Sequence, residues 1–276
     1  METVFIHWNP DPEIFSLGNF AIRWYGLLFA SSFVFGYIIL LRMFKKEGIP
    51  VKLLDDLTTY MIIGTIIGAR LGHVFFYEPA WYLSHPLKIL EIWEGGLASH
   101  GAGIGIILTL IIFSRVKKRP FLWVMDRIVI VVALSGFFIR MGNLMNSEIY
   151  GNMTTLPWGF YFLRSIVPSD AMQPRHPTQI YEALSYLAIF IFLINYYYKK
   201  NGTPSPGFLF GMFLILVFGI RFLIEFLKVP QVGFEQDMAL NMGQLLSIPF
   251  ILAGFVIVWL SLKSKLPGTV TGKPQQ

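Results

Sequence analysis

The stretch of this sequence best suited to chemistry is a polar cluster that directly follows a long apolar run. The run starts near Ile128, and the cluster Arg140–Gly151 holds one arginine, two asparagines and one glutamate. Charged and amide groups at the mouth of a membrane helix are costly to remove from water, so packing alone rarely explains them. The cluster therefore indicates a functional site.

A second candidate pair lies in a later apolar run. Arg221 and Glu225 are four residues apart, so on a helix they share one face and can pair. A purely structural ion pair is the alternative interpretation. Because both residues lie toward the same predicted end of their helix as Arg140, they are expected to complete one polar pocket with it.

Two histidines and a tyrosine are further candidates. His100 opens a glycine-rich stretch, His100–Gly105, whose small residues would also allow close helix packing. A neutral imidazole at membrane depth can accept a proton near pH 7, which makes His100 a candidate base. His176 can equally be a simple loop residue before the helix start at Pro177, and Tyr25 can belong to an interfacial aromatic belt.

Arginines are frequent in or at the ends of the apolar runs. The five are Arg23, Arg70, Arg127, Arg140 and Arg221. Each could pair with an acid or extend to the membrane surface. Arg127, beside Asp126, is interpreted as structural.

Composition places the chain in the membrane. Of its 276 residues, 55% are hydrophobic and only 14% are charged, which is too apolar for a soluble domain. Apolar runs of about 20 residues, the length that crosses a bilayer, can be placed seven times. They are 20–41, 57–77, 97–114, 121–139, 181–198, 208–227 and 242–262. The predicted fold is an all-α bundle of seven transmembrane helices.

The net charge of +6 is explained by topology, so nucleic acid is not an expected partner. Thirteen Lys and Arg residues fall in alternate loops on one side, against Lys88, Arg164, Arg175 and Lys228 on the other. The positive-inside rule then puts the N-terminus outside and the C-terminus in the cytoplasm. No Lys or Arg precedes Arg23, so the first span is not expected to be a cleaved signal peptide.

The chain is predicted to form a single transmembrane domain, 1–276, with two insertions on the outer side. The arm, Glu78–Gly96, carries Trp and Tyr residues suited to the lipid headgroup layer. The head, Gly142–Pro177, is the longest polar insertion, and the tail, 264–276, is predicted to be disordered. Because the chain has no cysteine, any thiol in its chemistry must come from a substrate.

Five motifs follow one another along nearly the whole chain. They are Arg23–Gly26 (RWYG), His100–Gly105 (HGAGIG), Arg140–Gly151 (RMGNLMNSEIYG), Arg175–Glu182 (RHPTQIYE) and Arg221–Glu225 (RFLIE). In this order they resemble the bacterial prolipoprotein diacylglyceryl transferase family. Arg140–Gly151 is specific to that family, whereas the other four are modest alone. Met141 departs from it, because many members have a smaller or β-branched residue there; this should affect packing and not chemistry.

The resemblance implies an enzyme of the bacterial cytoplasmic (inner) membrane with its active site toward the outer leaflet. It implies transfer of the diacylglyceryl group of phosphatidylglycerol to the lipobox cysteine of a prolipoprotein signal peptide, with release of glycerol 1-phosphate and without cofactor or metal. The implied catalytic residues are Tyr25, His100, Arg140, Arg221 and Glu225. The implied phosphatidylglycerol-binding residues are Arg140, Gly142, Asn143, Glu148, Gly151, His176 and Arg221.

Elementary chemistry agrees with this interpretation. A thiol with a pKa near 8.5 is mostly protonated at neutral pH, so attack on carbon needs a base, for which His100 is the candidate. The departing glycerol phosphate gains negative charge, which guanidinium groups can stabilise with paired hydrogen bonds. The group that takes the thiol proton stays open.

A transporter or a lipid-binding membrane protein is the alternative class. In it, the arginines would bind an anionic lipid without chemistry. The absence of paired Gly or Pro breaks in two halves of the sequence, and the concentration of polar residues on one face, argue against it.

Overall fold

The computed structural model describes residues 5–17, 20–229 and 238–263, which form two compact units. The first unit holds the described residues up to Ile39 and from Asp126 onward, and the second holds Leu40–Met125. The boundaries fall inside two long helices, and each unit is described by itself. The predicted disordered tail, 264–276, lies outside the described residues.

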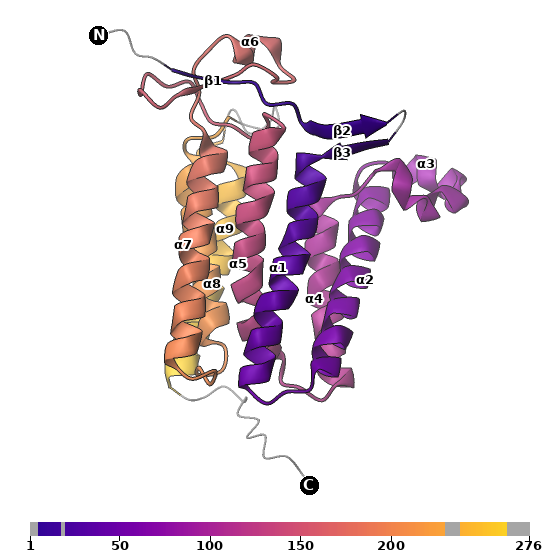
Figure 1. Cartoon of the computed structure of the whole chain (residues 1–276), viewed down its shortest axis with the longest axis vertical. Helices are drawn as coiled ribbons and strands as arrows, with labels where there is room; N and C mark the ends of the chain where they lie inside the picture. The colour runs from indigo at the N-terminus through magenta and orange to yellow at the C-terminus, as the bar shows by residue number, and fades with distance from the viewer. Residues whose placement is uncertain (1–4, 18–19, 230–237, 264–276) are drawn as a thin grey trace. The chain divides into compact units, whose positions relative to one another are not determined.

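The elements are mostly helical (Figure 1). The first unit contains α5 (Phe121–Met145, from Asp126), α6 (Pro168–Ala171), α7 (Thr178–Lys199), α8 (Phe208–Glu225), α9 (Met242–Leu262) and most of α1 (Trp24–Lys46). The second contains α2 (Val51–Phe76), α3 (Pro79–Ser84), α4 (Ser99–Val116) and the 3₁₀ turns η1 (Pro86–Leu90) and η2 (Ile92–Glu94).

Six described helices are long and apolar enough to cross a membrane: α1, α2, α5, α7, α8 and α9. This confirms a helical polytopic membrane protein. The remaining predicted span corresponds to α4, which is a shorter apolar helix over His100–Val116. A bundle of seven spans therefore stays a prediction. Among the six, α5 is the most enclosed, with 61% of its apolar window buried against 17% for α9.

The prediction of an all-α fold misses four short strands. β1 (Ile6–Trp8) pairs in parallel with β4 (Phe160–Phe162), and β2 (Glu13–Leu17) forms an antiparallel pair with β3 (Phe20–Arg23). Strands of three to five residues carry too little hydrophobic periodicity to stand out beside membrane helices. Arg23, at the end of β3, is exposed and pairs with Glu13 at 3.2 Å, so it lies before α1 and not within it.

The head has a small core of its own. Leu144, Phe160 and Phe162 are buried together, and Met141 packs against them. Met141, which departs from the family pattern, thus packs in this core. Figure 1 shows β1 and α6 lying together at one end of α5 and α7 in the first unit. Asp170 links two parts of the head, because it accepts hydrogen bonds from both Tyr150 and Arg175.

An aspartate in α5 fixes the start of α8. Asp126 is buried and accepts the backbone N–H groups of Gly207 (2.7 Å) and Phe210 (2.9 Å). These donors have no partner within the helix, so the carboxylate caps them as a side chain from another helix. Arg127 donates to the carbonyl oxygen of Gly202 in the same region, which confirms its structural interpretation.

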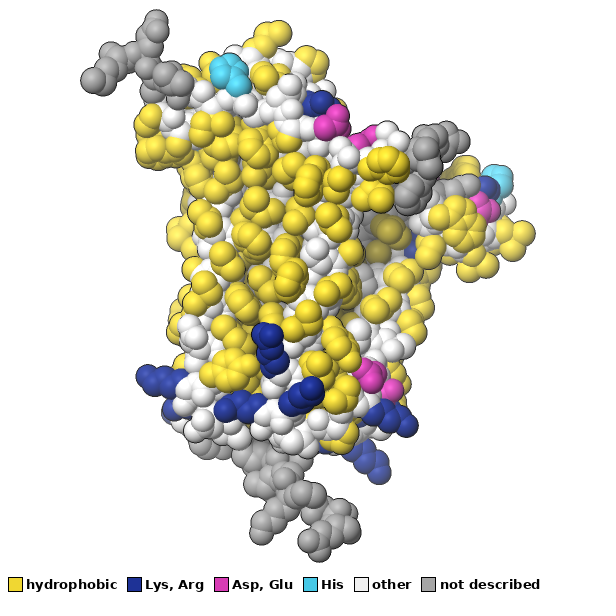
Figure 2. All heavy atoms as spheres, viewed as in Figure 1, with side chains coloured by type: hydrophobic (Ala, Val, Ile, Leu, Met, Phe, Trp, Pro, Cys, Tyr) yellow, Lys and Arg dark blue, Asp and Glu magenta, His cyan; other side chains and the backbone are white. Residues whose placement is uncertain are grey.

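The surface matches a membrane environment. On the face shown in Figure 2, mostly hydrophobic side chains cover the helices. The basic residues at helix ends include Lys45 and Lys46 of α1, Arg115 of α4 and Lys199 of α7. This is the distribution from which the sequence predicts a cytoplasmic side.

Candidate functional site

The site is organised around Arg140 in the last two turns of α5. Its Nε lies 2.8 Å from Glu182 Oε2, and its Nη2 donates to Glu182 Oε1 at 3.3 Å. The remaining nitrogen, Nη1, donates to Asn143 Oδ1 at 3.1 Å. Glu182 is fully buried in α7, so its charge depends on these partners. The guanidinium plane is thereby fixed by two neighbouring side chains.

Arg140 is joined to Arg221 through three further charged side chains. Lys228 Nζ lies 3.1 Å from Glu182 Oε1 and 3.1 Å from Glu225 Oε1. Glu225 Oε1 in turn lies 3.6 Å from Arg221 Nε, an ion pair too long for a hydrogen bond. Positive and negative groups thus alternate along one continuous series. We call this five-residue series the charge chain; its members are Arg140, Glu182, Lys228, Glu225 and Arg221.

Asn241 holds Glu225 from the opposite side. Its side-chain amide donates to Glu225 Oε2 at 3.2 Å, while its Oδ1 accepts the backbone N–H of Gln244 at 2.8 Å. The backbone N–H of Asn241 in turn donates to Gln244 Oε1 at 3.0 Å, which completes a capping box at the start of α9. The helix start therefore also fixes a site carboxylate.

Asn143 connects Arg140 to the loop after α5. Its amide donates to Glu148 Oε1 at 2.8 Å, and Asn146 donates to the same oxygen at 3.2 Å. The loop is backbone-strained, since Ser147 (φ 52) and Ile149 (φ 59) occupy the left-handed region that non-glycine residues rarely adopt. The beginning of α7 holds the loop, because Gln179 donates to the carbonyl oxygen of Glu148 at 2.7 Å.

The two site glycines permit close approach of other groups. A Cβ on Gly142 would lie 2.8 Å from a ring carbon of Tyr25, so the tyrosine packs directly over α5. A Cβ on Gly151 would lie 2.5 Å from the carbonyl oxygen of Leu227. Gly151 also forms an isolated antiparallel bridge with Lys228, which brings the segment after α8 against the loop. Both glycines act on the packing of the site.

The two histidines occupy different units. His176 lies in the first unit; its Nδ1 is 3.2 Å from the Tyr181 hydroxyl, and it lines a cavity of about 490 Å³ with Thr154 and Gln173. Burial lowers the pKa of His176, so its imidazole is neutral at neutral pH and offers hydrogen bonds, not charge. His100 is exposed in the first turn of α4 in the second unit, and its role as base stays a prediction.

Arg70, another arginine singled out by the sequence, ties the arm to α2. Its guanidinium donates to the carbonyl oxygens of Ile89 (2.8 Å) and Gly95 (2.7 Å), and also to those of Lys88, Glu91 and Gly96. It also lies over the Tyr82 ring, 4.9 Å from its centroid. These contacts give Arg70 a structural explanation.

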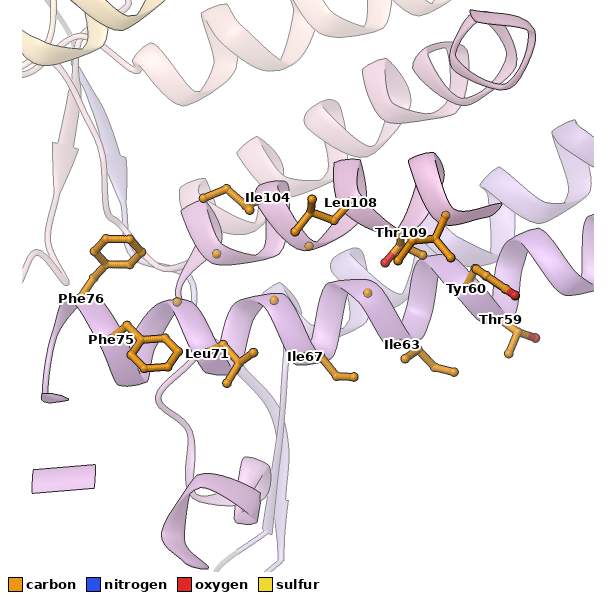
Figure 3. A pocket seen from close by; sticks show the side chains of 16 residues that line it. Thr59, Tyr60, Ile63, Ile67, Leu71, Phe75, Phe76, Ile104, Leu108 and Thr109 are labelled. Atoms are coloured by element: carbon orange, nitrogen blue, oxygen red, sulfur yellow. The ribbon is translucent and has the colours of Figure 1, made fainter. Parts of the chain in front are cut away.

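An apolar groove runs along α2 and α4 in the second unit (Figure 3). It has a volume of about 730 Å³, and its walls include Ile63, Ile67 and Leu108. Glycines on both helices allow their backbones to touch: a Cβ on Gly68 would lie 2.4 Å from the carbonyl oxygen of Gly101. Among the described residues that line it, the polar side chains are the hydroxyls of Thr59, Tyr60 and Thr109, and none is charged.

Comparison with known proteins identifies the family. The family model described as prolipoprotein diacylglyceryl transferase matches residues 12–260. The chain belongs to the prolipoprotein diacylglyceryl transferase family. That range contains every residue of the charge chain and both glycines of the site.

Relatives are similar over nearly their whole length. The phosphatidylglycerol–prolipoprotein diacylglyceryl transferase of Tolumonas auensis is 50% identical over 261 residues, covering 94% of this chain and 99% of the relative. Those of Porphyromonas gingivalis and Chloroherpeton thalassium are 47% and 44% identical, each covering 94% of this chain and 95% of the relative. Each of these three alignments covers nearly all of both chains.

The structure adds site residues that the sequence analysis does not predict. Glu182 and Lys228 join the two arginines, and Asn241 fixes Glu225. Only Asn241 has a local signal, since Asn241-Met-Gly-Gln244 is a capping-box pattern before an apolar run. The sequence analysis counts Lys228 only as a basic residue of the outer side, and it names Glu182 only as the last residue of the Arg175–Glu182 motif.

Proposed function

We propose that this protein transfers the diacylglyceryl group of phosphatidylglycerol to the lipobox cysteine of a prolipoprotein signal peptide. Family membership supports the reaction, and the observation that carries its assignment to this site is the pair of arginines joined by the charge chain. Two guanidinium groups, each paired with a carboxylate, are suited to a phosphate whose negative charge grows during the reaction.

The bond changes follow from the substrates. The cysteine sulfur attacks the glycerol carbon that carries the phosphate oxygen, so a C–S bond forms as the C–O bond breaks. The electron pair of the broken bond leaves with the phosphate, which becomes the monoester glycerol 1-phosphate. The thiol proton goes to a base, for which His100 is the proposed residue. Because the leaving group gains one negative charge, cations placed beforehand lower the barrier.

Several of the predicted site residues have a proposed part in this reaction. Arg140 and Arg221 bind the phosphate, and Glu225 orients Arg221. Asn143 and Glu148 hold Arg140 and the lipid glycerol in place, which agrees with the 3.1 Å and 2.8 Å contacts of Asn143. Tyr25 packs over Gly142 in α5, two residues from Arg140, and is proposed to border the headgroup.

The site is proposed to face the outer leaflet of the bacterial cytoplasmic membrane, with seven spans, an outside N-terminus and a cytoplasmic C-terminus. The basic ends of α1, α4 and α7 support this orientation. Both substrates are then membrane-bound, and the lipid would enter sideways between helices.

Purified protein tests the function directly. It is incubated with phosphatidylglycerol and a lipobox peptide, and the peptide is examined by mass spectrometry for the added diacylglyceryl group. A transporter or lipid binder consumes neither substrate, so an absence of product from folded wild-type protein would contradict the proposal.

Substitution of Arg140 tests the site. R140A and R140K are both expected to lose activity by about a hundredfold or more, because lysine keeps the charge but not the planar fork. R164A is the matched control, since Arg164 is an exposed arginine paired with Asp11 in the head. Near-normal product formation by folded R140A would remove Arg140 from the proposed mechanism.

A further inference from the structure

Lys228 occupies the centre of the charge chain although it belongs to none of the recognised motifs. It follows α8 by three residues, and its side chain is only 3% exposed. Its Nζ contacts one carboxylate from α7 and one from α8, each at 3.1 Å. The backbone bridge to Gly151 fixes the segment that carries it. An ammonium group so enclosed is costly to bury unless it is paired on both sides.

The charges show what Lys228 adds. Without it, Arg140 with Glu182 and Arg221 with Glu225 would form two ion pairs, each with no net charge. With Lys228, the charge chain has three cations and two anions, so it carries one surplus positive charge. Lys228 draws on the same oxygen of Glu182 that Arg140 Nη2 uses, so the carboxylate neutralises each cation only in part. Both arginines thus keep positive charge for an added anion.

We propose that Lys228 is a positioning residue that sets the spacing of the two arginines and leaves them with surplus positive charge for a phosphate. It acts through Glu182 and Glu225 and does not touch the lipid, because its ammonium group is enclosed by these two carboxylates. This inference rests on the proposed function of the site. The anion it favours is a phospholipid phosphodiester, whose charge increases when the diacylglyceryl group leaves.

Three variants separate charge from bulk. K228M removes the charge, K228Q keeps a hydrogen-bond donor without charge, and K228R keeps the charge. The matched control is K88M, because Lys88 forms an ion pair of the same i,i+3 spacing with Glu91, at 2.7 Å on the arm. For each variant, kcat and KM are measured with phosphatidylglycerol and a lipobox peptide, and thermal unfolding is measured in the same detergent.

K228M and K228Q are expected to lower kcat by about tenfold to a hundredfold, less than the loss from a direct oxyanion donor. K228R is expected to recover most of this loss, and K88M is expected to match the wild type. A residue that served packing alone would instead lower thermal stability together with activity, and Arg and Gln would rescue equally.

A binding measurement keeps the test independent of catalysis. Affinity is measured for short-chain phosphatidylglycerol and for the uncharged diacylglycerol with the same chains. K228M and K228Q are expected to weaken binding of the phospholipid alone. If the wild type bound the lipid but made no thioether, the proposed function would fail. The comparison of phospholipid binding between the wild type and the Lys228 variants would still test the role of Lys228.

Two results overturn the inference. One is wild-type kcat and phospholipid affinity in K228M. The other is an equal loss in K228R and K228Q, which would show that charge is not what matters. Should K228M fail to fold, K228Q takes its place against K228R with the same two criteria.

Discussion

Glycine 243 illustrates how a single small residue can protect the geometry of the site. It lies in the first turn of α9, beside Glu225 of α8, and a Cβ at this position would lie 2.6 Å from the Glu225 carboxyl carbon and from Oε1. Those atoms are the end of a flexible side chain, so they can move. Such a move would break the contacts of Glu225 with Lys228 and Asn241.

G243A is therefore expected to lower transferase activity by about tenfold. Thermal stability is expected to change little, because the helix preference of alanine over glycine, about 1 kcal/mol, offsets the loss of the Glu225 contacts. Activity and unfolding temperature are measured on the same preparation. G219A in α8 is the control, because a Cβ there meets no atom within 4 Å. Full activity in G243A would show that the position of Glu225 is not critical.

Sequence separation decides which site residues could be predicted. Arg221 and Glu225 share a helix face, so their pairing follows from spacing alone. Glu182 is 42 residues from Arg140 and 46 from Lys228 in the chain, and only the packing of α7 against its neighbours brings them together. Lys228 is one of the four basic residues on the predicted outer side, and no local sequence pattern distinguishes it as a buried lysine.

Among the elements, the α2–α4 pair depends most on glycine. Its helices touch along their backbones, so that a Cβ on Gly68 would lie 2.4 Å from Gly101 O and 2.7 Å from Gly105 Cα. Backbone atoms cannot move aside as a side chain can. Gly103 belongs to the same motif, but a Cβ there meets no atom within 4 Å.

G68A is thus expected to destabilise the protein by about 1–3 kcal/mol, the usual cost of overpacking, while G103A is neutral or slightly stabilising. Thermal unfolding in detergent measures both. Equal stability of the two variants would contradict the close backbone contact. The comparison also tests the motif's interpretation, because its glycines would then differ in role according to the helix face on which they lie.

Element boundaries were predicted where charge or proline ends an apolar run, as at the start of α7 after Pro177. The start of α2 was missed by six residues, because Val51–Asp56 carries one lysine and two aspartates that interrupt the apolar pattern. The strands escaped prediction because short β pairs at a membrane surface depend on tertiary contacts.

For the whole molecule, the placement of Lys and Arg residues predicts which loops face outside and which face the cytoplasm. This orientation can be tested with single introduced cysteines, because the sequence has no cysteine of its own. Met172 lies in the head with 77% of its surface exposed, and Ser205 is exposed in the connection between α7 and α8. The positive-inside rule puts the first outside and the second, near Lys199 and Lys200, in the cytoplasm. Single-cysteine variants at these positions have no background thiol within the chain.

A membrane-impermeant maleimide applied to intact spheroplasts is expected to label M172C fully. It is expected to label S205C only after the membrane is permeabilised, because a charged reagent cannot cross the bilayer core. The unsubstituted protein is the control for labelling of other groups. Labelling of S205C without permeabilisation, together with protection of M172C, would reverse the proposed orientation. The charge chain would then lie toward the cytoplasmic leaflet. An exported signal peptide could not present its cysteine to that leaflet from outside.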